Sequence, residues 1–368
     1  MARSAAGMIR SAGLALGIAC VAIGWTGTAR AQVTNPPAEP IRLSYAPVSP
    51  NAAIRYWAVW SSIAREVSEA AGAIEWKDAE GVTDEARMPE SYRAYLKVSA
   101  EHPNGIPALI QATRIPRCDF ELELDQGPSV LLPHLGGFRR AARVLRADAR
   151  RLLIAGDVDG AAERIAAMLR SAAHLQSDRT LISNLVEQAI VGVAVDELRT
   201  LAPRLSVERR LELRAMLLRY DPRDPFRMRQ TLAIERDVMT SWLRGSTPDQ
   251  IGAMMKEFES TDRAREAGEQ YRKLTPAQHA EQVDRYVRSY NDMIEAWDSG
   301  DQDRLKRVAS SIKPDSERYG VLASFLAADV AGMFTRLEPA TGLIREGLKL
   351  LPDAGAPAAA GGPAKPKE

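Results

Sequence analysis

The chain has 368 residues, with 49 basic and 48 acidic side chains and two cysteines. This balance of charge argues against non-specific binding to nucleic acid, and we expect no nucleic-acid partner. The length is enough to bury one or two hydrophobic cores.

The first residues are typical of a cleavable secretory signal. Arg3 and Arg10 give a positively charged start, residues 14–25 form a short apolar core, and residues 29–32 ("ARAQ") contain the small-x-small pattern of a cleavage site. The apolar core is too short to cross about 30 Å of hydrocarbon comfortably, so a retained anchor is the alternative. Cleavage after Ala31 predicts an exported protein, periplasmic or extracellular.

Cleavage also defines what the mature chain contains. Cys20 leaves with the signal, and it is a poor site for lipid attachment because Gly17 stands where that motif has Leu. The mature chain keeps 46 basic and 48 acidic residues, a formal charge of −2, and one cysteine, Cys118. It can form no internal disulfide and must rely on its core. No later segment approaches 18 apolar residues in a row, so we expect no stable membrane span.

Composition divides the rest of the chain into three parts. Residues 32–50 contain five prolines and predict an extended leader. Residues 352–368 are rich in Pro, Ala and Gly and predict a disordered tail. Residues 51–351 predict a helical domain, which could divide into two lobes near 221–245.

The first helices of this domain follow from apolar periodicity. We expect one over 51–71, capped by Asn51, then a loop over 72–88 and a helix over 89–101. The sequence "HPNG" (102–105) ends that helix, because Pro and Gly interrupt its hydrogen bonds. From Leu131 the helical signal is strong, and a tight connection and a second helix follow this helix. Its residues on a single apolar stripe are Phe138, Ala141, Ala142, Leu145, Ala149 and Leu152. The later helices are expected over 180–201, 206–219, 225–244, 248–257, 261–273, 276–298, 301–311, 318–336 and 339–350.

Two resemblances accompany this pattern. Residues 143–175 are similar to a tetratricopeptide-type helical hairpin, with a Gly-Asp turn followed by Ala161 and Ala162. The family's aromatic signature is absent, and no second copy appears at its period of about 34 residues. This resemblance therefore implies antiparallel stacking of two helices and nothing more.

The chain also resembles a loosely defined family of exported, largely helical bacterial proteins of unassigned function. The resemblance rests on "PRCDF", "DQGP", "LLPHL" and the arginine-rich helix after them, and it spans about residues 51–240. It implies no catalytic residue. The expected fold class is all-α, an irregular, α-solenoid-like array of antiparallel helical hairpins, with a short extended segment near 119–125.

This extended segment carries the first candidate site. Four acids alternate with apolar residues, which in an extended chain places them on one face. They are Asp119, Glu121, Glu123 and Asp125. Clustered carboxylates favour calcium, but the spacing is not that of an EF-hand and no His or Cys lies among them for zinc. The alternative is a charged edge that is simply solvated or that pairs with an arginine stripe on the next helix, formed by Arg139, Arg143, Arg146 and Arg150. We favour this alternative and expect no metal and no cofactor.

The second candidate is Glu235, which shares a helical stripe with four apolar residues. Burial raises the pKa of a carboxyl unless it is paired, and general acids are made in this way. The alternative is a structural ion pair with an arginine on a neighbouring helix.

Three further polar positions complete the candidates. Glu187 lies with Asn184 and Gln188 in a helix that is apolar all round, with His174 nearby, and hydrogen bonds between helices are the simplest interpretation. His134 follows a proline at an expected helix start, where a capping or core role outweighs a catalytic one.

Two functions follow from these observations. The first is an exported interaction or scaffold protein of the cell envelope, since stacked helices leave grooves that bind proteins or peptides. The second is an enzyme or small-molecule binder with a cleft between helices, which would use Glu235 and Glu187. A shallow groove lined by exposed aromatic residues would favour the first, and a deep pocket holding an unpaired Glu235 would favour the second.

Overall fold

The computed structural model describes residues 50–79, 82, 84–103, 105–258, 262–326 and 342–353. The predicted signal peptide, the leader up to residue 49 and the tail from residue 354 lie outside these residues. The helices given below belong to one compact unit, Asn51–Glu368.

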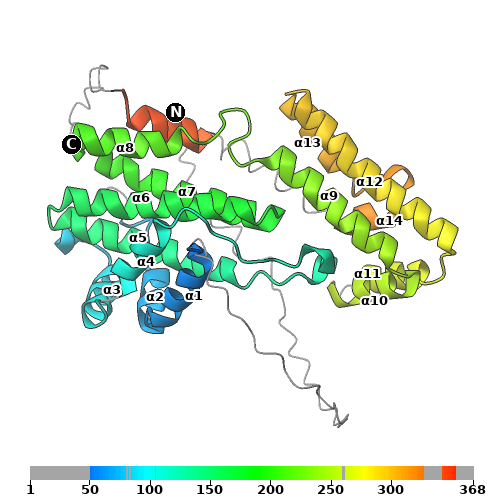
Figure 1. Cartoon of the computed structure of the whole chain (residues 1–368), viewed down its shortest axis with the longest axis horizontal. Coiled ribbons are helices and arrows are strands. Elements are labelled where there is room, and N and C mark those ends of the chain that lie inside the picture. The colour runs from blue at the N-terminus through cyan, green and yellow to red at the C-terminus, as the bar shows by residue number, and fades with distance from the viewer. Residues whose placement is uncertain are drawn as a thin grey trace, which may run out of the picture. The chain divides into compact units, whose positions relative to one another are not determined.

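The described residues form helices joined by loops and turns and contain no β-strand, which confirms the all-α class (Figure 1). The α-helices are α1 (Ala52–Ser62), α2 (Arg65–Ala73), α3 (Glu90–Glu101), α4 (Gly105–Thr113), α5 (His134–Ile154), α6 (Val158–His174), α7 (Leu181–Leu201), α8 (Val207–Leu217), α9 (Met228–Gly245), α10 (Pro248–Phe258), α11 (Asp262–Tyr271), α12 (Pro276–Asp298), α13 (Gln302–Ser311) and α14 (Ser316–Leu326). Residues 342–350 form a further helix. Short 3-10 turns are η3 (Glu85–Arg87), η4 (Leu124–Ser129), η5 (Leu175–Ser177) and η6 (Ala202–Arg204).

The helix expected over 51–71 is two helices. Ile63 leaves the helical conformation, with φ −72° and ψ 118°, and α2 starts at Arg65. No proline or glycine marks this break. Ile63 packs against the backbone of Gly105. A Cβ atom added to Gly105 would lie only 2.7 Å from the Cγ1 atom of Ile63. The approach of α4 to this point accounts for the break, and α4 itself was not expected from the sequence.

The starts of the helices are easier to predict from the sequence than this break, because cap side chains bond to the backbone only a few residues away. Asn51, Asp157, Thr180, Ser206 and Thr275 each accept a hydrogen bond from a backbone N–H in the first turn of the helix that follows. Such bonds satisfy donors that the helix itself leaves free.

The helices α5, α6 and α7 form the centre of one hydrophobic core and lie side by side in Figure 1. The expected apolar stripe of α5 is buried, from Phe138 to Leu152. Five of the nine buried residues of α6, which packs on α5, are alanines, and such small side chains allow a close approach of helix backbones.

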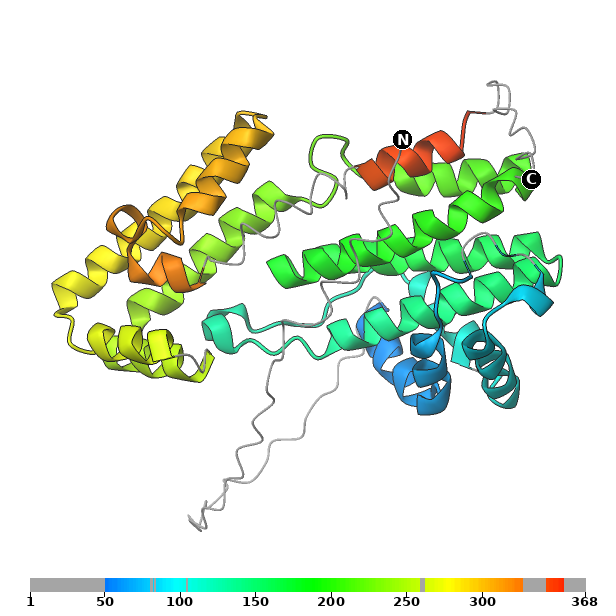
Figure 2. The ribbon, with the colours of Figure 1, turned by 180° about the vertical axis from the view of Figure 1, so that it is seen from behind.

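A second hydrophobic core lies between α9, α12 and α14 (Figure 2). Along the chain, Phe226 belongs to the first core and Met228 to the second. This change falls inside the range 221–245 where the sequence suggests a division, although the division into lobes stays a prediction.

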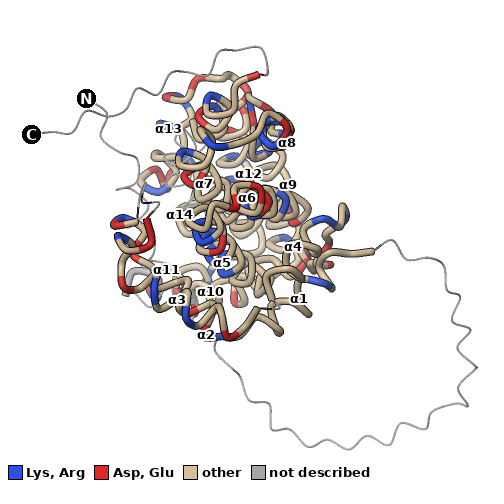
Figure 3. Tube along the Cα trace, turned by 90° about the vertical axis from the view of Figure 1, so that its left-hand side faces the viewer, with Lys and Arg blue, Asp and Glu red and all other residues tan. Residues whose placement is uncertain are grey.

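Most helices carry both positively and negatively charged residues along their length (Figure 3). Within the described part of the chain, no helix combines the length and the apolar character that a membrane crossing requires.

One charged group is an exception because it lies in the core. The Arg150 side chain is only 2% exposed, and each of its five N–H donors has an acceptor. Its Nε and Nη2 atoms donate to the Glu197 carboxylate at 2.8–3.1 Å, and its Nη1 atom donates to the carbonyls of Ala79 and Val82 at 2.7 and 2.9 Å. The buried pair therefore joins α5 and α7 to the segment between α2 and α3.

Removal of the carboxylate tests this contact. We expect Glu197→Ala to lower the free energy of unfolding in urea by about 3–5 kcal/mol, because it leaves a buried guanidinium without its counter-charge. Asp284→Ala is the matched control, since Asp284 pairs at 3.5 Å with Arg244 and both are exposed; it should cost less than about 1 kcal/mol. An equal, small loss in both variants would contradict the role given to Glu197.

Candidate functional site

The four acids of residues 119–125 do not form the expected row. Glu121 has a left-handed backbone, φ 52°, and the 3-10 turn η4 starts at Leu124, so the alternation of an extended chain is lost. Asp119 accepts a hydrogen bond from the N–H of Glu121 at 2.9 Å and pairs with Arg117 at 3.2 Å. These two contacts lower the pKa of the Asp119 carboxyl. Among the described residues, no group of three acidic, His or Cys side chains could hold a metal ion.

The arginine stripe of α5 is not the partner of these acids in the described residues. In its C-terminal half Arg150 is buried and Arg146 is half-buried. Arg146 donates to Glu197 at 2.9 Å and stacks on Trp76 at 4.0 Å. Its N-terminal half, Arg139 and Arg143, is exposed. The pairing expected from the sequence is therefore wrong, because α7 supplies the carboxylate that Arg146 and Arg150 bind. Glu121, Glu123 and Asp125 are exposed, which agrees with the other form expected, a solvated edge.

His134 is the first residue of α5 and is buried. Its Nε2 atom lies 2.7 Å from Oδ2 of Asp178, and the same oxygen accepts a hydrogen bond from the Ser183 hydroxyl at 2.7 Å. In a catalytic triad the imidazole stands between the hydroxyl and the carboxylate, whereas here the carboxylate stands between the other two. This network ties the start of α5 to the start of α7 and agrees with a core role.

Glu235 is half-buried on α9, and burial raises the pKa of its carboxyl. The backbone N–H of Leu181, at the start of α7, partly offsets this rise. Among the described residues it has no arginine partner at ion-pair distance. It does not line either of the two pockets described below, and a catalytic role for it stays a prediction.

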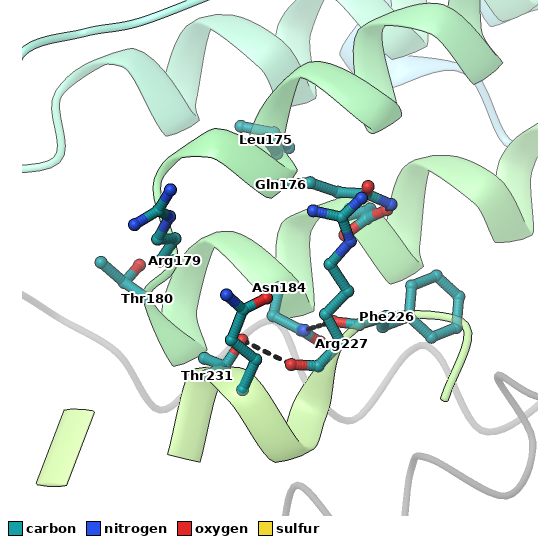
Figure 4. Close-up of a pocket in the computed structure, with 10 residues that line it drawn as sticks. Leu175, Gln176, Arg179, Thr180, Asn184, Phe226, Arg227 and Thr231 are labelled. Atoms are coloured by element: carbon teal, nitrogen blue, oxygen red, sulfur yellow. Dashed lines mark hydrogen bonds between the residues drawn. The ribbon is translucent and has the colours of Figure 1, made fainter. Parts of the chain in front are cut away.

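Glu187 lines a small pocket between η5, the start of α7 and the start of α9 (Figure 4). Gln176 donates to its Oε1 atom at 2.6 Å, and Figure 4 shows the Arg227 guanidinium beside Gln176. The free volume is about 10 Å³, which is room for a single water molecule. Asn184, in the same pocket, donates to the carbonyl of Phe226 and accepts from Gln188 at 2.5 Å.

The backbone around this pocket contains two unusual residues. Arg227, directly before α9, and Arg179, two residues before α7, have left-handed conformations with φ 53° and 57°. Such a conformation costs about 1–2 kcal/mol for a residue other than glycine. The side chains lie on opposite sides of the pocket in Figure 4, and no feature of the sequence pointed to either residue.

A much larger cleft lies between the end of α1, α2 and α5. Its volume is about 860 Å³, and it is lined by Trp60, Ser61, Ile63, Ala64, Arg65, Ser68, Glu69, Gly72, Ala73, Arg140 and Arg143. Arg65 and Glu69 pair with each other at 2.6 Å along α2. Arg140 and Arg143 are exposed, and neither has an ion-pair partner in the part of the chain described. The free positive charge of the cleft therefore comes from α5.

Aromatic side chains extend from this cleft onto the surface. The ring of Trp60 lies flat on Gly137 of α5. A Cβ atom added to Gly137 would be only 2.6 Å from this ring. Its indole N–H is buried and has no acceptor within the described residues. Trp57, at 45% exposure, meets Trp60 edge to face with ring centroids 5.2 Å apart. Trp60 therefore lines the cleft, and Trp57 lies beside it on the surface.

Comparison of the chain with known protein families, curated proteins and solved structures finds no match. The two resemblances drawn from the sequence therefore stay predictions.

The Glu187 carboxyl predicts a specific dependence of stability on pH. Burial raises its pKa to about 8, with Gln176 and Arg227 opposing the rise. Between pH 4.5 and 8 the folded state holds a proton that the unfolded state has lost, so this group lowers the free energy of unfolding as pH rises. We expect Glu187→Gln to remove this contribution, which is at most about 1.4 kcal/mol per pH unit for one proton.

The measurement is urea unfolding of both proteins at several pH values, and the difference between them cancels other titrating groups such as His174. Burial lowers the pKa of His174 to about 4, which acts in the opposite direction at acid pH. Glu66→Gln, at an exposed position of α2, is the control and should keep the wild-type slope. Parallel curves for wild type and Glu187→Gln would contradict a buried, protonated Glu187.

Proposed function

We propose that the protein is an exported interaction protein that binds an acidic segment of a partner protein in the cleft between α1, α2 and α5. The observation that carries this proposal is the pair of exposed arginines, Arg140 and Arg143, on one wall of a cleft of about 860 Å³.

Charge is the first argument for an acidic occupant. Arg65 is neutralised by Glu69 within the cleft, whereas Arg140 and Arg143 face it without a carboxylate from the described chain. A guanidinium binds a carboxylate through two parallel N–H···O bonds, and these charge-assisted bonds are stronger than neutral ones. A segment carrying Asp or Glu would supply the missing partners.

The apolar lining is the second argument. Ile63, Ala64 and Ala73 line the cleft beside the Trp60 ring, and Trp57 continues the apolar surface outward. Trp and Arg are the residues most enriched among the side chains that dominate binding at protein interfaces. The unpaired indole N–H of Trp60 would gain an acceptor from any bound carbonyl or carboxylate that reaches it. We therefore expect an aromatic or large aliphatic side chain next to the acids of the partner.

The place of action rests on the sequence of the N-terminus. A positive start, a short apolar core and a small-x-small site support export through a signal cleaved after Ala31. The proposed partner is thus a protein of the same exported compartment.

No specific observation favours catalysis over binding. The pocket at Glu187 has room for one water molecule, and Glu235 lies outside it. The two carboxyls named as candidate acids therefore do not share a site.

Panning of a random peptide library on the full mature protein tests the proposal. We expect the enriched peptides to carry two or more acidic residues next to an aromatic or large aliphatic residue. For a synthetic peptide of this kind, Arg140→Glu with Arg143→Glu should raise Kd by about 10-fold or more in fluorescence anisotropy, because two favourable charge contacts become repulsive.

Arg139→Glu is the matched control, since Arg139 is an exposed arginine of the same helix that does not line the cleft. It should change Kd by less than about 3-fold through its long-range charge alone. Enrichment of no peptide, of peptides without acids, or of peptides whose affinity survives the double charge reversal would each count against the proposal.

A further inference from the structure

The helix α8 leaves an apolar face uncovered. Val207, Leu211 and Leu218 are 57%, 40% and 58% exposed, and Ala215 between them is exposed as well. Successive members are four, four and three residues apart, a spacing that places them on one stripe of a helix. This set is called the α8 stripe below. Leu218 is the C-cap residue of α8, and its backbone is still helical, so the stripe continues to that residue.

The opposite side of α8 is already occupied. Leu213 and Leu217 are buried, and Leu217 lies close to Gly347 in the helix 342–350. Arg214 donates to the carbonyls of Leu348 and Leu351 at 3.2 and 2.9 Å. The α8 stripe is therefore apolar surface beyond what the packing of this chain uses in its described part. Three of the large apolar side chains that the structure leaves exposed belong to it.

Charged residues mark the two ends of the stripe with opposite signs. Glu208 follows Val207, and Arg219 follows Leu218. Both are exposed, and neither has an ion-pair partner among the described residues. They are eleven positions apart, about 16 Å along a helix, so they cannot reach each other within one chain.

This arrangement is complementary to itself. When a second α8 lies antiparallel on the first, a two-fold axis between Leu211 and Ala215 sets Val207 of one copy against Leu218 of the other. The same axis sets Leu211 against Ala215, where the small side chain permits a close approach, and Glu208 against Arg219. An isologous interface requires that each surface match its own copy in this way.

We propose that the α8 stripe is the contact through which two copies of this chain associate, with the two α8 helices antiparallel. One short helix per copy buries an area at or below the low end of specific interfaces, about 1,200 Å², so the dimer is weak and depends on concentration. The proposal does not depend on what the cleft at α5 binds.

Sedimentation of the full mature protein over about 1–200 µM measures the association. We expect a reversible monomer–dimer equilibrium that Leu211→Glu abolishes within this range, because it places two carboxylates near the axis. Leu131→Glu is the matched control, since Leu131 is 77% exposed outside the α8 stripe. It should leave the equilibrium unchanged, and circular dichroism should confirm that both variants are folded.

Charge reversal tests the antiparallel register. Glu208→Arg and Arg219→Glu should each weaken the homodimer, because each brings like charges together twice. The double variant should recover the wild-type dissociation constant within about 3-fold, and an equimolar mixture of the two single variants should form a heterodimer.

Three results would overturn the proposal. A monomer at every concentration would show that the stripe has another occupant or none. A dimer that persists in Leu211→Glu would place the contact on another surface. Single charge reversals that weaken the dimer without recovery in the double variant would exclude the antiparallel pairing.

Discussion

The buried contact of Arg150 with Glu197 determines where several elements of the first core can lie. All five donors of Arg150 are used, two of the acceptors being carbonyls of the segment between α2 and α3. Arg146 strengthens the arrangement from the same helix, since it donates to Glu197 and stacks on Trp76 in that segment. A fully paired guanidinium in the core tolerates little displacement, because every lost bond leaves a buried polar group unsatisfied. The contact therefore holds the segment that follows α2 against α5 and α7.

One helix thus carries two kinds of arginine. The C-terminal half of the α5 stripe holds the fold together, and its N-terminal half faces the cleft and the surface without carboxylate partners from the described chain. The same residue type serves both purposes because a guanidinium can be buried when fully paired and can bind carboxylates when exposed. If the α8 stripe also joins two copies, each assembly would present two clefts, and a partner with two acidic segments would bind with higher apparent affinity than a single site gives.

Much of the fold could be predicted from the sequence, because helix caps and apolar periodicity act over a few residues. Ser206 and Thr275 cap the helices that follow them, and the apolar stripe of α5 is buried, as caps and periodicity predict. The failures have tertiary causes. The break at Ile63 depends on the approach of Gly105, and the left-handed Glu121 removes the alternation on which the acidic row rested. Glu187 was identified as a polar residue of an apolar helix, but its pocket is made by Arg179 and Arg227, whose backbone conformations no local pattern predicts. The cleft was missed because its walls, α2 and α5, are far apart in the chain.

Hydrogen exchange of the full mature protein, with and without an acidic peptide selected on it, tests whether the cleft is the binding site. We expect slower exchange in residues 57–73 and 134–145, which form the two walls of the cleft, and unchanged exchange around the Glu187 pocket in residues 175–187 and 224–232. Protection confined to the Glu187 pocket, or to α8, would contradict the assignment of the cleft as the binding site. Protection of both cleft walls that disappears in the Arg140→Glu, Arg143→Glu variant would establish it.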